Sequence, residues 1–134
     1  MSTRGLNNNN PGNIRKGSSP FFGEKKSTDS QFRQFESIEL GYRAMFVLLN
    51  SYVNKGFDTI EKIISRWAPS NENDTKAYIN TVSKLSAVSP QTKVSPADKD
   101  SMVRIVSAMS QVENGIKANV NQVASGWDMF EKKK

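Results

Sequence analysis

Chemistry in this sequence must come from carboxylates, hydroxyls, lysines or tyrosines, because the chain contains no cysteine and no histidine. Thiol nucleophiles, Cys/His metal sites and Ser-His triads are therefore excluded. We expect no metal ion and no organic cofactor. A carboxylate that breaks a local structural rule is then the first candidate for a catalytic group.

Glu113 is such a carboxylate. It falls in the last turn of a predicted helix, directly before Asn114-Gly115, a pair typical of a helix end. The negative end of the helix dipole and the apolar neighbours Val112 and Ile116 both disfavour the ionised form of this carboxyl group. A carboxyl group that keeps its proton near neutral pH can act as a general acid. The alternative is a surface helix that ends in glutamate by chance.

A second group of candidates lies between two predicted helices, from Trp67 to Asp74. Trp67 offers a flat face on which a sugar ring can stack, and Glu72 or Asp74 can supply a second carboxylate. The structural alternative makes Trp67 a core residue and Asp74, or Asn73, a helix cap.

The third group is the turn from Asn10 to Arg15, in which Pro11-Gly12 favours a tight turn. The amides of Asn10 and Asn13 can bind the N-acetyl and hydroxyl groups of a saccharide, and the alternative is a turn with solvated amides. Glu36 is a further catalytic candidate, although a glutamate there also favours the start of the next helix.

The spacing of apolar residues predicts a mainly α fold with a single domain over 1–134. Residues 1–35 are expected to form an irregular or hairpin lobe, with edge strands at 21–22 and 32–35, and residues 36–130 a helical core. Helices are predicted over 38–54, from an Asp58 cap to Pro69, from Asp74 to Leu85, from a Ser95 cap to Asn114, and over 120–130. The residues predicted to be mostly buried are Ala44, Phe46, Leu48, Leu49, Ile63, Ile64, Val82, Leu85, Ile105 and Val106.

The formal net charge of +6 favours an anionic partner, such as nucleic acid, anionic lipid or a bacterial wall polymer. Nucleic acid ranks last, because the chain lacks a basic helix and a basic stripe interleaved with aromatic residues. No apolar run approaches the roughly 20 residues that a membrane span needs. The first residues, MSTRGLNNNN, lack the apolar stretch of a signal peptide, and none is expected.

The chain resembles a family of small phage and prophage virion proteins, the structural protein P5-like family, over nearly its whole length. The resemblance lies in the strings NNNNPGNIRKG, FRQFESIELGYRAMFVLLNSY, IISRWAPSNENDTKAYINTVSKLSAVSP and VENG. Members commonly have His-Glu-Asn-Gly at the last string. Here Val112 replaces the histidine, so no role of that side chain carries over.

The same segments are more faintly similar to lysozyme-like glycosidases and lytic transglycosylases that cut peptidoglycan. In those enzymes a helix ends in a Glu-Ser-Gly-like catalytic turn, and Glu113 to Gly115 are similar to that turn. In glucosaminidases an Asn-x-Phe-Gly-Ile-Lys-like segment follows the turn, and Asn10 to Arg15 are similar to that segment. The two segments occur here in the reverse order along the chain, since the asparagine segment comes first. The similarity implies a circularly permuted lysozyme-like domain. It also implies Glu113 as the catalytic acid, with Asn10, Asn13, Arg15 and Tyr78 in the cleft.

The leading hypothesis is a phage or prophage glycosidase that cleaves the β-1,4 amino-sugar backbone of peptidoglycan. A single essential Glu113 fits a lytic transglycosylase, whereas a second carboxylate, Glu36, Glu72 or Asp74, fits hydrolysis of the muramidase type. The alternative is a non-catalytic virion structural or cell-wall-binding protein. The expected partners are bacterial peptidoglycan and other virion proteins, and the expected location is the virion or the host cytoplasm, with action on the wall.

Overall fold

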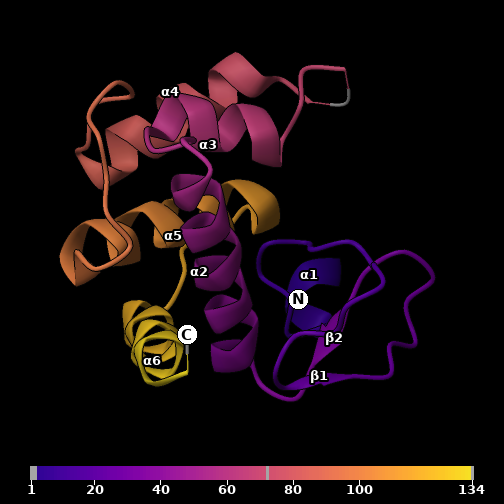
Figure 1. The fold of residues 1–134 in the computed structure, drawn as a ribbon. Coiled ribbons are helices and arrows are strands. Elements are labelled where there is room, and N and C mark those ends of the chain that lie inside the picture. Colours follow the sequence, from indigo (N-terminus) through magenta and orange to yellow (C-terminus); the bar gives the residue numbers. More distant parts are fainter. Residues whose placement is uncertain (1–2, 72, 134) are drawn as a thin grey trace.

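The structure is a computed structural model that describes residues 3–71 and 73–133. Over these residues it is mainly helical, which confirms the predicted mainly α fold. In chain order the elements are α1 (Arg4–Asn7), β1 (Glu24–Lys25), β2 (Gln34–Phe35), α2 (Ile38–Asn54), α3 (Ile60–Trp67), α4 (Thr75–Ser86), α5 (Lys99–Asn114) and α6 (Val120–Lys132). Figure 1 shows a lobe of α1, β1 and β2 beside the longer helices. None of the helices in the described ranges combines the length and apolar character that a membrane crossing needs.

The central helix of the fold is α2, with α6 on one side and the lobe on the other (Figure 1). It begins after Ser37, whose hydroxyl oxygen accepts a hydrogen bond from the Leu40 amide at 3.2 Å. Five of its side chains are at most 1% exposed: Tyr42, Ala44, Met45, Phe46 and Leu49. Helix α6 packs so closely that a Cβ added at Gly126 would lie 2.7 Å from Tyr42 Cβ. A larger residue at position 126 would therefore push the two helices apart.

Two helices begin later than the sequence predicted. Thr59 rather than Asp58 caps α3, because the Thr59 hydroxyl oxygen accepts the Lys62 amide. Asp98 rather than Ser95 caps α5. Ser95 forms a separate turn instead, since its carbonyl oxygen accepts the Asp98 amide at 3.0 Å.

The lobe is a compact loop structure with little regular sheet. Strands β1 and β2 pair antiparallel, and Arg15 and Phe32 form an isolated antiparallel bridge. The strand predicted at 21–22 is wrong: these residues lie in the turn before β1, where Gly23 has φ +81° and no extended run can form. Phe35 is completely buried and anchors the lobe.

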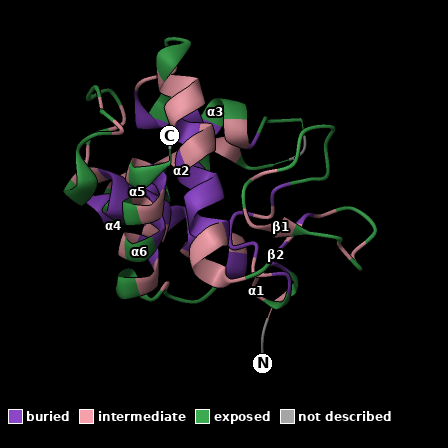
Figure 2. Cartoon of the chain, turned by 60° about the horizontal axis from the view of Figure 1, so that its bottom comes forward, coloured by how far each residue is buried: buried purple, intermediate pink, exposed green. Residues whose placement is uncertain are grey.

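The predicted core is largely confirmed. Figure 2 shows the buried residues gathered along α2 and the helices around it. Two of the predicted core residues are exceptions. Leu48 is half-buried, and Leu85 is 45% exposed. Leu85 lies in the last turn of α4, where the next residue, Ser86, is buried instead and Ala87 is the C-cap.

Candidate functional site

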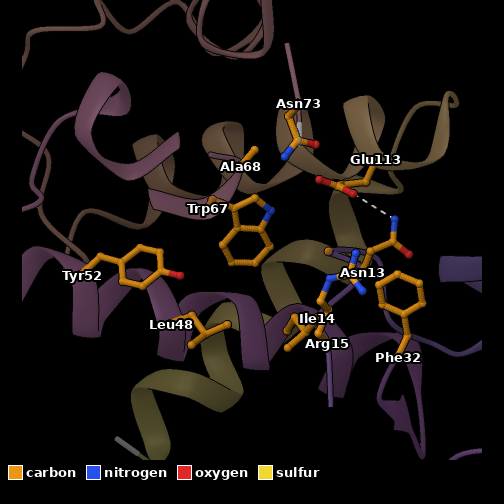
Figure 3. A pocket seen from close by; sticks show the side chains of 11 residues that line it. Asn13, Ile14, Arg15, Phe32, Leu48, Tyr52, Trp67, Ala68, Asn73 and Glu113 are labelled. Carbon is orange, nitrogen blue, oxygen red and sulfur yellow. Dashed lines mark hydrogen bonds between the residues drawn. The ribbon is translucent and has the colours of Figure 1, made fainter. Parts of the chain in front are cut away.

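Glu113 is the group around which a site can be built. It lies in the last turn of α5 and is half-buried. Its Oε1 accepts a hydrogen bond from Asn13 Nδ2, and its Oε2 accepts one from the Tyr78 hydroxyl, both at 2.9 Å. The bond from Asn13 is drawn in Figure 3. Segments from the lobe, α4 and α5 thus converge on one carboxyl group.

The loop that carries Asn13 is held in shape by Asn10. Asn10 has 0% exposure; its Nδ2 donates to the carbonyl oxygens of Ile14 and Arg33, and its Oδ1 accepts the Ile14 amide. Asn10 therefore supports the loop and presents no free polar atom to a ligand, in contrast to its predicted place in the cleft. Asn13 has φ +50°, a left-handed conformation that asparagine tolerates better than most residues.

The residues after Glu113 fix the loop to the helix. Asn114 is 6% exposed, and its Nδ2 donates to the carbonyl oxygens of Pro11 and Ser110 at 2.9 and 3.0 Å. Its Oδ1 accepts the Thr3 hydroxyl at 2.6 Å. Gly115, with φ +73°, ends the helix. Sequence reasoning identified the Glu-Asn-Gly turn but missed the tethering role of Asn114, because periodicity carries no signal for a bond to a distant loop.

Tyr78 reaches Glu113 from α4 and is 6% exposed. Burial raises the pKa of the Tyr78 hydroxyl well above its usual range, and the negative charge of the neighbouring carboxylate adds to the rise. Tyr78 therefore remains protonated and acts as a donor. The Tyr78 hydroxyl also lies 3.5 Å from the Met109 carbonyl oxygen, which offers it a second acceptor.

Glu113 lies between two hollows in the surface. The first has a volume of about 390 Å³ and is lined by Gly12, Asn13, Ile14, Arg15, Phe32, Leu48, Tyr52, Trp67, Ala68, Asn73 and Glu113. The second has a volume of about 330 Å³ and is lined by Asn73, Asp74, Ala77, Tyr78, Thr81, Val112 and Glu113. Because Asn73 and Glu113 line both, the two hollows adjoin at this carboxyl group, and we refer to them together as the groove. The lining by Asn73, Phe32, Leu48 and Tyr52 was not predicted, since nothing in their local spacing indicates a pocket.

Trp67 serves both the core and the groove. It is half-buried, lies edge-on to Tyr52 with ring centroids 6.4 Å apart, and lines the first hollow. A Cβ at Gly12 would lie 2.8 Å from the indole ring, so only glycine lets the loop backbone pass this close. In the view of Figure 3, Trp67 lies between Tyr52 on the left and Glu113 on the right.

The other predicted carboxylates are placed differently. Asp74 caps α4 by accepting the Ala77 amide at 3.1 Å and lines the second hollow. Glu36 is exposed at the start of α2 and is absent from the lining of both hollows, so the structure does not bring it to Glu113. Glu72 lies outside the described residues. Within 3–71 and 73–133, no three acidic side chains are grouped as metal ligands would be.

Comparison with known proteins identifies a phage protein as a relative. No protein-family model matches the chain. The chain is 39% identical over 119 residues to Protein P5 of Pseudoalteromonas phage PM2, an alignment that covers 85% of this chain and 72% of that protein.

Proposed function

We propose that this chain, which belongs to the family of phage Protein P5, is a peptidoglycan-cleaving glycosidase with Glu113 as its general acid. The observation that carries the proposal is the groove: a half-buried carboxyl group, held by Asn13 and Tyr78, lies between two hollows that can each take part of a glycan strand. Trp67 adds an aromatic surface to one hollow, on which a sugar ring can stack. The net charge of +6 suits a polyanionic wall.

In the proposed reaction Glu113 transfers its proton to the oxygen of the β-1,4 bond as the bond from that oxygen to C1 breaks. The leaving sugar departs with a free 4-hydroxyl, and positive charge develops at C1 of the other sugar. The 6-hydroxyl of that same sugar, or a water molecule, then bonds to C1 and loses its proton to the Glu113 carboxylate. The first outcome is a lytic transglycosylase and the second a muramidase.

General acid catalysis needs a protonated Glu113 whose proton points to the glycosidic oxygen. The Tyr78 hydroxyl also lies 3.5 Å from the Met109 carbonyl oxygen, so it has an alternative acceptor when Glu113 is protonated.

Asp74 is the second carboxylate that this groove offers among the described residues. Its Oδ1 already accepts the Ala77 amide as the cap of α4. Because this contact already gives Asp74 a structural role, we favour the transglycosylase form of the reaction. The Asp74→Asn variant tests this choice: asparagine also caps helices well, so the fold should persist. We expect cleavage to continue with 1,6-anhydro-muramyl ends, and loss of cleavage would instead assign Asp74 to hydrolysis.

The main experiment is cleavage of purified peptidoglycan, with mass analysis of the products, by the wild type and by Glu113→Gln. Glutamine keeps the size of the side chain but cannot donate the catalytic proton. We expect the rate of cleavage to fall by about 10²–10⁴-fold, while the circular dichroism spectrum stays unchanged. Glu36→Gln is the matched control, because it removes an exposed carboxylate outside the groove and should keep full activity.

Unchanged cleavage by a folded Glu113→Gln variant would remove Glu113 from the mechanism. A wild type that binds peptidoglycan without cutting it would favour the alternative, a cell-wall-binding or structural component of the phage particle. In the proposed role, peptidoglycan is the substrate and the enzyme acts from the particle or from the host cytoplasm.

A further inference from the structure

Arg15 is a cation held at the edge of the first hollow by the geometry of the lobe. It pairs with Phe32 in the antiparallel bridge, flanked by the bonds from Lys16 N to Gln31 O and from Arg33 N to Ile14 O. Residues paired in this way have their side chains on the same face of the ladder. The Arg15 guanidinium accordingly lies over the Phe32 ring, with Cζ 5.1 Å from the ring centroid, and both residues line the hollow.

The neighbouring arginines of the lobe are neutralised, and Arg15 is not. Arg4 forms a two-bond ion pair with Asp29, and Arg33 pairs with Glu24. Among the residues that the structure describes, the Arg15 guanidinium has no ion pair and no hydrogen-bond acceptor. Its charge is therefore available to a ligand, while stacking on Phe32 restrains its position.

Arg15 is also the single cation that lines this hollow within the described part of the chain, where Glu113 is the single anion. The remaining lining side chains are amides, aromatic rings and aliphatic groups, which suit a neutral sugar. A neutral polymer of N-acetylglucosamine would leave the Arg15 charge without a partner. A glycan strand whose sugars carry branches ending in carboxylates would supply that partner.

The geometry points to Arg15 as the residue that selects a carboxylate-bearing glycan, by binding a carboxylate on the branch of a muramic acid seated in the first hollow. This inference rests on the proposed function, since it concerns the substrate of the same groove. In intact peptidoglycan the carboxylate belongs to the peptide stem, and in peptide-free glycan it belongs to the lactyl group. Guanidinium and carboxylate match as planar, two-bonded partners, so lysine at this position should be a poor substitute.

The test compares wild type, Arg15→Gln and Lys16→Gln on three preparations of wall. One is native peptidoglycan, one has its peptides removed by an amidase, and one has its carboxyl groups converted to neutral amides. Lys16→Gln is the matched control, because it removes the same charge from the adjacent exposed residue, which does not line the hollow. Both binding to the insoluble wall and the rate of cleavage are measured.

We expect Arg15→Gln to lower affinity and kcat/KM about tenfold on native wall, as for loss of a charge-assisted hydrogen bond. On amidated wall Arg15→Gln should match wild type, and Lys16→Gln should match wild type on native wall. A tenfold loss that persists on peptide-free glycan would identify the lactyl carboxylate as the ligand, and a loss confined to native wall would identify the stem peptide.

Equal effects of Arg15→Gln on native and amidated wall, or equal effects of the two variants, would overturn the inference. These outcomes leave the proposed function standing, because wild type would still cut the wall. Conversely, a wild type that binds but does not cut would overturn the proposed function, while the binding measurements would still test Arg15.

Discussion

Replacement of Asn114 by alanine should damage both stability and the site, through the loss of one side chain that joins the lobe to α5. The Asn114 side chain joins α5 to the Pro11 carbonyl oxygen and to the Thr3 hydroxyl. In Asn114→Ala the Thr3 hydroxyl can turn toward water, since Thr3 is half-buried. The Pro11 carbonyl oxygen cannot, because Pro11 is buried and has no other donor among the described residues.

The magnitude follows from this orphaned acceptor. A buried polar group without a partner costs about 1–3 kcal/mol, so we expect a loss of about 2 kcal/mol in the free energy of unfolding. The space left by the amide adds to the loss, because Asn114 Oδ1 lies only 2.7 Å from where a Cβ of Gly5 would be. For a domain of this size, about 2 kcal/mol corresponds to a fall in Tm of roughly 8 °C.

The assay combines urea unfolding with cleavage of peptidoglycan at a temperature at which all variants are folded. The Asn114 tether holds the loop that carries Asn13, so Asn114→Ala should lower kcat/KM by the same route as Asn13→Ala. The double variant should then be little worse than the poorer single variant, because neighbours that act through one contact are not additive. Additive losses in kcat/KM, or a change in Tm below about 2 °C, would refute the reasoning.

Two predictions concern pH. Tyr78→Phe should be about 1 kcal/mol less stable than wild type at pH 8, where the donor to Glu113 is lost. Because the pKa of Tyr78 is raised on folding, wild type loses stability as pH rises above about 10, and the variant, which has no hydroxyl there, should show a smaller loss in urea melts at pH 8 to 11. The pKa of Asp29 is held far below its usual range, chiefly by hydrogen bonds from Arg4. Its stabilising effect is therefore present above about pH 4 and lost as pH falls below that, so the stability difference between wild type and Asp29→Asn should shrink in acid unfolding curves below pH 4.

The helices were predictable because their signals are local. The pair Lys55-Gly56 ends α2 and Asn114-Gly115 ends α5, and the glycines have φ +96° and +73°, which other residues rarely adopt. Asp74 caps α4 as predicted, since its carboxylate accepts an amide of the first turn. The caps of α3 and α5 were misplaced because several residues near each start have side chains that can cap, and tertiary packing selects among them.

The candidate site was only partly predictable, because its contacts are not local. The hydrogen bond from Asn13 to Glu113 spans 100 residues, and no apolar period relates the two positions. Similarity to lysozyme-like enzymes suggested that this loop and Glu113 share a cleft. It also suggested Asn10, whose amide is instead consumed inside the loop. Composition can identify which residues are able to bind a sugar, but burial decides which of them are free to do so.

The three residues of the Glu-Asn-Gly turn have three different roles. Glu113 lines the groove, Asn114 ties the lobe to α5, and Gly115 ends the helix. The lobe and α5 come from distant parts of the chain, and the first hollow exists only when the lobe lies against the helices. A Cβ at Gly41 would clash with the Asn9 carbonyl oxygen, so only glycine lets the lobe lie this close to α2. Residues far from Glu113 therefore control its position, and the chemistry of the groove depends on how the lobe is docked as much as on the residues that line it.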